Sequence, residues 1–171
     1  MLEQPFMPRG NGWYDVRFES TVADALRGVA SDILDELKDT TDPGLRRLFP
    51  PAYLEDAPRE EEFEIMTRDD LLIRKRNAAE AVVKSIDKGK SKKGTWSGRI
   101  DEELAQAWLA VMNDARLIIG TRLDVTEDMD PDPLPPEDPN APQYNLYLVL
   151  GALEWALVEA LMVGLPPVVE D

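Results

Sequence analysis

The sequence contains no cysteine and no histidine among its 171 residues. A chain without cysteine forms no disulfide and offers no thiol nucleophile, and the lack of histidine removes the imidazole base that many hydrolases use. Zinc sites built from these two residue types are excluded for the same reason. These absences rule out triad hydrolases and thiol redox enzymes. We predict no catalytic residue, no metal site and no cofactor.

Acidic residues strongly outnumber basic ones, since the chain has 34 Asp and Glu residues but only 19 Lys and Arg residues. The formal net charge is therefore −15. Such a charge opposes generic attraction to nucleic acid or to an anionic membrane. Hydrophobic residues make up 43% of the chain, enough for one core, so we predict a single domain over residues 1–171 with flexible termini at 1–12 and 165–171. The first residues lack the apolar run of a signal peptide, and we expect a cytoplasmic protein.

Hydrophobic periodicity predicts a mainly α fold, a single-domain bundle of about four principal helices. Apolar residues recur every three or four positions over about 21–39, 68–87, 101–123 and 144–163. Apolar and polar residues alternate over 13–19, which predicts a short N-terminal strand. The brief alternation at Phe63 and Ile65 makes them the candidate partner of this strand in a small two-stranded sheet.

The last predicted helix is apolar on most faces and is about as long as a membrane span. Glu154 and Glu159 lie inside it. An acid near the centre of a span costs about 3 kcal/mol on insertion scales, whereas each Leu returns only about 0.5 kcal/mol. We therefore predict a buried central helix surrounded by the others, and no membrane partner.

Two loops of opposite charge connect the predicted helices. Residues 88–98 hold four lysines and three glycines and are predicted to be a mobile basic loop, and 124–143 hold six prolines and seven acids and are predicted to be an acidic surface loop. Within the second loop, Asp128, Asp130 and Asp132 have the spacing of calcium ligands. The pattern then fails at Pro133 and Pro139, where a calcium loop needs Gly and Glu, so a solvated loop is favoured.

A carboxylate-based or metal-assisted enzyme is an alternative that would need Asp114, Glu154 or Glu159 to converge. Five residues advance a helix by about 500°, so Glu154 and Glu159 lie roughly 140° apart around the axis. This spacing favours a separate counter-ion for each, since a buried carboxylate needs a partner. Arg116 and Arg122 are the candidate counter-ions, or else part of an edge that binds a partner.

The basic residues are concentrated in one segment. Residues 68–99 carry a net charge of +6, which leaves −21 for the rest of the chain. The segment is interpreted as a solvated face or as a surface for a protein partner, with DNA binding by residues 74–93 as an alternative. The candidate partner-binding residues are Arg74, Lys75, Arg76, Lys90, Lys92, Lys93, Arg116 and Arg122.

Several blocks of the sequence resemble the actinobacterial domain-of-unknown-function family 2017. They are Asp42-Pro43-Gly44-Leu45-Arg46-Arg47-Leu48-Phe49-Pro50-Pro51-Ala52-Tyr53, Glu62-Phe63 before Thr67-Arg68-Asp69-Asp70-Leu71, Ala107 to Leu117, and Gly120-Thr121-Arg122-Leu123. The resemblance covers residues 16–163.

One studied kind of protein in the family that this chain resembles is an oxidative-stress transcriptional regulator. It senses the redox state through a Cys pair and works with an alternative sigma factor. This chain has no Cys, so that sensor is not implied for it. The resemblance implies a non-enzymatic cytoplasmic regulator of transcription or stress response that acts through protein contacts. Its expected partner is a protein of the transcription machinery, and a homodimer is left open.

Overall fold

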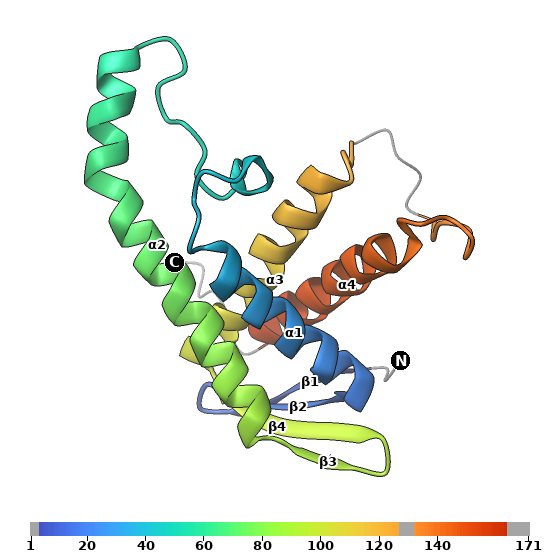
Figure 1. The fold of residues 1–171 in the computed structure, drawn as a ribbon. Helices are drawn as coiled ribbons and strands as arrows, with labels where there is room; N and C mark the ends of the chain where they lie inside the picture. The colour runs from blue at the N-terminus through green and yellow to red at the C-terminus, as the bar shows by residue number, and fades with distance from the viewer. Residues whose placement is uncertain (1–3, 127–131, 164–171) are drawn as a thin grey trace, which may run out of the picture.

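The computed structural model describes residues 4–126 and 132–163, which form four helices and one four-stranded sheet (Figure 1). The elements in chain order are β1 (Phe6–Gly10), β2 (Trp13–Glu19), α1 (Ser20–Glu36), the 3-10 turn η1 (Pro43–Leu45), α2 (Ala57–Lys88), β3 (Lys90–Lys92), β4 (Thr95–Asp101), α3 (Glu102–Arg122) and α4 (Ala141–Val163). The four predicted helices are confirmed. The prediction of a mainly α fold with at most a two-stranded sheet is wrong in the size of the sheet, because the described residues form four strands in one sheet.

The sheet is antiparallel with the order β1-β2-β4-β3. The predicted strand over 13–19 is confirmed, but its partners are β1 and β4, and Phe63 and Ile65 lie in α2. The basic loop predicted at 88–98 is wrong, since it contains β3 and the start of β4, joined by a turn in which Lys93 and Gly94 have positive φ. The prediction of a flexible terminus over 1–12 is wrong from Phe6 onward, because β1 pairs with β2 there.

Helix α2 begins at Ala57, eleven residues before the predicted start at about 68. Pro58 is tolerated because it stands in the first turn, where its missing N–H has no partner to lose. The carboxylate of Asp56 caps the helix by accepting a hydrogen bond from the Arg59 N–H at 3.2 Å. Proline and acidic residues therefore mark the beginning of this helix and do not prevent it.

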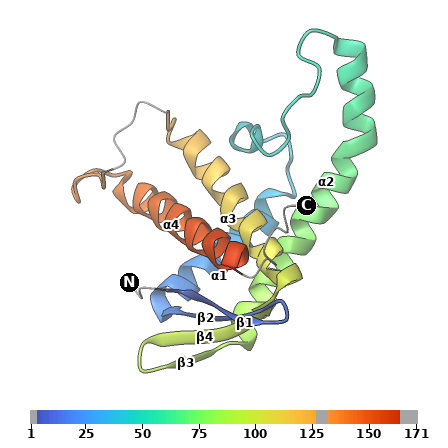
Figure 2. The same cartoon turned by 180° about the vertical axis from the view of Figure 1, so that it is seen from behind.

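The core lies between the helices and one face of the sheet, and both views show the helices gathered on the same side of the strands (Figure 2). Phe18 of β2 stacks on Trp96 of β4 with ring centroids 5.1 Å apart, and Trp108 of α3 closes the cluster from the helix side. The Trp96 indole donates a hydrogen bond to the Ile86 carbonyl at 3.1 Å. The aromatic cluster thus ties the sheet to α2 and α3.

Helix α4 differs from the surrounded central helix that the sequence predicts. Leu150, Leu153 and Leu157 are buried against α3 and the sheet, but Trp155 and Met162 are 68% and 66% exposed. The helix begins at Ala141, so the last three residues of the predicted acidic loop are helical, and Asp128 and Asp130 lie outside the described residues. By length and composition alone α4 is apolar enough to cross a membrane, a property that core helices share.

Candidate functional site

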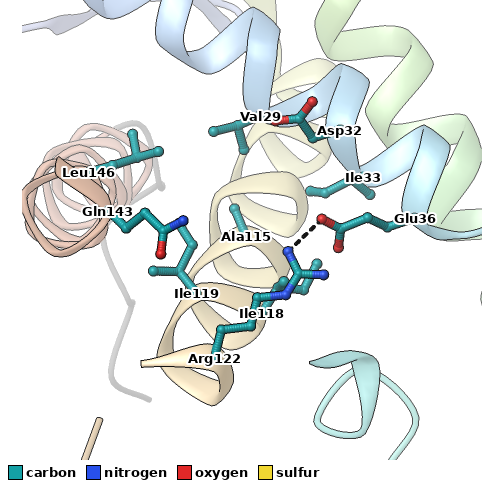
Figure 3. A pocket seen from close by; sticks show the side chains of 10 residues that line it. All are labelled: Val29, Asp32, Ile33, Glu36, Ala115, Ile118, Ile119, Arg122, Gln143 and Leu146. Carbon is teal, nitrogen blue, oxygen red and sulfur yellow. Dashed lines mark hydrogen bonds and ion pairs between the residues drawn. The ribbon is translucent and has the colours of Figure 1, made fainter. Parts of the chain in front are cut away.

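A groove lies between α1 and α4, with α3 as its floor (Figure 3). Its lining residues are Val29, Asp32, Ile33 and Glu36 from α1, Ala115, Ile118, Ile119 and Arg122 from α3, and Gln143 and Leu146 from α4. The residues from each helix are three or four apart, so each set lies on one helical face. The volume of about 210 Å³ is below the 300–1,000 Å³ typical of small-molecule sites. This groove is sized for one or two side chains.

The polar side of the groove is acidic, and not all of its carboxylate oxygens have a hydrogen-bond partner within the described residues. Arg122 donates a hydrogen bond to Glu36 Oε1 at 2.8 Å and another to Asp42 Oδ2 at 3.3 Å. The hydrogen bond with Glu36, together with the charge of Asp42, raises the pKa of Arg122, although partial burial acts against this. The second oxygen of Glu36, Oε2, is buried and has no hydrogen-bond partner within the described residues. Asp32 stands exposed one turn away on the same wall.

The end of the groove is held by two sequence blocks that lie far apart in the chain. Asp42 caps η1 by accepting a hydrogen bond from the Gly44 N–H at 2.7 Å, and its other oxygen reaches Arg122. A Cβ on Gly44 would lie 3.0 Å from Arg122 Nε, so glycine lets the guanidinium pack against the turn. The Asp-Pro-Gly and Gly-Thr-Arg blocks therefore meet through Arg122.

Arg116 is engaged inside the protein, on the other side of α3. It forms an ion pair with Glu154 of α4, and its guanidinium lies 4.8 Å from the centre of the Tyr147 ring. Gly151 permits this approach, since a Cβ there would lie 3.3 Å from Arg116 Cζ. Glu154 and Arg122 thus each have the kind of counter-ion that the spacing of the sequence favours.

Lys75 and Asp114 form a second internal pair, between α2 and α3. Lys75 Nζ lies 2.7 Å from Asp114 Oδ1, and the two side chains are 16% and 6% exposed. Burial raises the pKa of Asp114 above its ordinary value, and the nearby Lys75 acts in the opposite direction. Since Asp114 pairs with Lys75 while Glu154 pairs with Arg116, these carboxylates do not converge on one site. Within residues 4–126 and 132–163 there is no cluster of three or more potential metal-ligating side chains.

The remaining predicted binding residues lie on two separate surfaces. Arg74 and Arg76 are exposed on α2, whereas Lys90, Lys92 and Lys93 are exposed on the β3–β4 hairpin. About 20 Å of helix separates residues 74 and 88 at 1.5 Å per residue, so the segment 74–93 is not one continuous surface. A partner-binding role for these residues stays a prediction.

Sequence reasoning missed the acidic wall of the groove. Asp32 and Glu36 are four residues apart on the polar flank of the apolar stripe of α1, a position that on its own is typical of a solvated face. They become neighbours of Gln143 only because α1 and α4 lie on either side of α3.

Comparisons with known proteins agree on one family. A family model described as "Domain of unknown function (DUF2017)" matches residues 3–161. The oxidative stress regulator AosR of Mycobacterium bovis is 30% identical over 167 residues, which covers 88% of this chain and 72% of the relative. The proteins of the same name from two strains of Mycobacterium tuberculosis match with the same identity and coverage. No solved structure matches the chain significantly.

Proposed function

The chain belongs to the DUF2017 family, and from this premise we propose that it is a stress-response regulator that acts by binding a protein partner in the groove between α1 and α4. Its relatives at 30% identity are named oxidative stress regulators, and this distant homology supports a regulatory role in the stress response. The finer parts of the proposal are a cytoplasmic location, a non-enzymatic mode of action and a partner from the transcription machinery.

The groove is the observation that carries the proposal. Its apolar floor offers a place for one or two aliphatic side chains, and its volume of about 210 Å³ favours such side chains over a metabolite. Its wall offers the exposed carboxylate of Asp32, which would accept hydrogen bonds from a cation. The occupant best suited to this chemistry is an amphipathic segment that carries Lys or Arg beside its apolar residues.

A non-enzymatic mode of action is supported by the state of the carboxylates. Asp114 and Glu154 are each neutralised by a basic side chain from a neighbouring helix. The two pairs join different helices, α2 with α3 and α3 with α4, so these carboxylates do not meet. The alternative of a carboxylate-based enzyme therefore lacks the convergent geometry that it needs.

The test is affinity capture of the tagged protein from its native cells, with and without oxidant. Asp32→Lys combined with Gln143→Arg reverses the charge along the rim of the groove without touching its buried floor. We expect this variant to lose a sigma factor, polymerase subunit or other transcription component that the unaltered protein retains. Asp24→Lys combined with Asn145→Arg is the matched control, because it changes exposed residues of the same helices outside the groove by the same total charge.

Two outcomes would contradict the proposal. One is the recovery of no component of the transcription machinery by the unaltered protein, and the other is an equal loss of that component in the groove variant and the control. Because the chain has no Cys, a dependence on oxidant that arises in this chain must come from its methionines, and otherwise it arises in the partner or in its expression.

A homodimer remains a separate proposal, and the exposed apolar residues of α4, such as Trp155 and Met162, offer a face for it. Sedimentation of the unaltered protein and of Trp155→Lys tests this directly, since a dimer built on this face would dissociate in the variant.

A further inference from the structure

The outer face of the sheet carries basic side chains from all four strands. Strand residues alternate between the two faces, and the inward set, including Tyr14, Phe18 and Trp96, is buried in the core. The outward set is exposed to solvent, because the described helices lie on the opposite side of the sheet (Figure 2). Its basic members are Arg9 on β1, Arg17 on β2, Arg99 on β4, and Lys90 and Lys92 on β3.

The register of the strands brings these cations together from distant parts of the chain. Arg17 pairs with Ser97, and Ser97 pairs with Lys90, so the three lie in one row across neighbouring strands. With about 4.8 Å between strands, the Cα atoms of Arg17 and Lys90 are roughly 10 Å apart. Arg99 occupies the adjacent row on β4, opposite Asp15.

A hollow of about 420 Å³ is formed on this face, lined by residues of all four strands and by Lys88 and Gly89 at the end of α2. Five basic residues line the hollow, namely Arg9, Arg17, Lys88, Lys90 and Arg99, and Asp15 is its one acidic lining residue among the described residues. Asp15 is already bound by Arg9 and Arg99. Arg17, Lys88 and Lys90 are exposed at the rim, and the lining has a net charge of +4.

The local charge matters more here than the total of −15. At physiological ionic strength the Debye length is about 8 Å, so the field at this face is dominated by the groups that line it. The acidic wall of the groove belongs to α1, which lies with the other helices on the opposite side of the sheet (Figure 1). An anion that approaches the hollow therefore meets attraction, whereas Glu19 and Asp101 of the same outward set lie outside its lining.

We propose that the outer face of the sheet binds a single strand of nucleic acid through its phosphate backbone. The cations are spread across four strands on an open surface, which suits an extended polyanion better than one small ion. Trp13 lies on the same face and is 45% exposed, which gives a base a ring on which to stack. An acidic peptide would gain from the cations but not from Trp13, so the indole distinguishes the two ligands.

The probe is a fluorescein-labelled strand of fifteen thymidines, and binding is followed by fluorescence anisotropy at several salt concentrations. Each phosphate neutralised on a single strand contributes about −0.7 to the slope of log K against log salt. Arg17→Gln combined with Lys90→Gln removes two contacts and is expected to make the slope shallower by about 1.4 and to weaken binding at low salt at least about tenfold. Trp13→Ala is expected to weaken binding severalfold with an unchanged slope, because it removes stacking and no charge.

Arg46→Gln combined with Arg47→Gln is the matched control, since these exposed residues follow η1 and carry the same charge away from the sheet (Figure 1). It is expected to change binding less than threefold. Equal weakening by the two double variants would overturn the proposal, as would failure of the unaltered protein to bind the strand at low salt. If a polyglutamate peptide of equal charge displaces the strand as well as unlabelled thymidines do and Trp13→Ala has no effect, the face binds acidic polymers in general and the assignment to nucleic acid is wrong.

Discussion

Replacing Lys75 by Met should destabilise the protein strongly, although the sequence suggests a surface role for this lysine. Its Nζ lies 2.7 Å from the carboxylate of Asp114, whose side chain is only 6% exposed. Loss of Lys75 leaves that carboxylate buried without a counter-ion, and breaking a buried pair on one side costs about 3–5 kcal/mol. An exposed pair would cost less than about 1 kcal/mol. For a domain of this size we expect the melting temperature to fall by roughly 6–20 °C.

The assay is urea unfolding at neutral pH of the unaltered protein, Lys75→Met, Asp114→Leu and the double variant. Removing both charges at once eliminates the unpaired carboxylate, so the double variant should regain most of the lost stability. Burial raises the pKa of Asp114 above the ordinary Asp value, and NMR of its carboxyl carbon would measure this pKa. In Lys75→Met it should rise further, since the remaining influence that lowers it is gone.

A loss below about 1 kcal/mol in Lys75→Met would refute the reasoning, because it would mean that the pair is effectively exposed. The same conclusion would follow if the double variant were no more stable than the single one. If Lys75→Met kept its stability but lost a protein partner, the lysine would belong to a binding surface, as the sequence alone suggests.

Two further predictions concern packing and acid stability. Gly98→Ala should lower the free energy of unfolding in urea by about 1–3 kcal/mol, because its Cβ would lie 2.5 Å from the Trp96 ring. Gly28→Ala, on the exposed face of α1, should instead stabilise the protein by about 0.5–1 kcal/mol. Since the hydrogen bond from Arg27 lowers the pKa of Asp87 below 3.8, this pair stabilises the fold above that pH and loses its contribution as the pH falls below it. Between pH 2 and 5 the free energy of unfolding should therefore change less with pH in Arg27→Gln than in the unaltered protein. An unchanged pH dependence would contradict this assignment.

The helices were predictable where one apolar stripe is enough to define them. α1 and α3 end within a few residues of their predicted bounds, because Leu26, Ile33 and Trp108 belong to stripes that face a single core. α2 was predicted only from about residue 68 onward, so its first eleven residues were missed. Its first turns carry Pro58 and an acidic run, which are typical of loops but are equally compatible with a helix N-terminus.

The sheet could not be predicted from local pattern because its apolar residues are sparse. β4 buries Trp96 and Ile100, four residues apart, and the outward residues between and beside them are polar or basic. Lysine and glycine in this segment are typical of a mobile loop, whereas pairing with β2 supplies the backbone hydrogen bonds that make it a strand. The aromatic cluster with Phe18 is a tertiary contact that no local window contains.

The groove depends on the relative placement of three helices, which the sequence does not specify. Uniform apolarity predicts a fully surrounded α4, yet the helix packs on one side only and leaves Trp155 exposed. Because α4 lies beside α3 and away from α1, Gln143 and Leu146 become a wall facing Asp32. Ion pairing was more predictable, since Arg116 and Arg122 are the candidate counter-ions for helix carboxylates in the sequence and pair with Glu154 and Glu36 in the structure.

Photo-crosslinking in native cells tests the central claim, a protein partner seated between α1 and α4, most directly. A photoreactive phenylalanine analogue replaces Gln143 at the rim of the groove or, in the control, exposed Asn145 on another face of the same helix. The claim predicts that position 143, and not position 145, links to a segment rich in Lys or Arg within one transcription component, and that Asp32→Lys abolishes the link. Equal crosslinking from both positions, or a link that Asp32→Lys leaves intact, would contradict it.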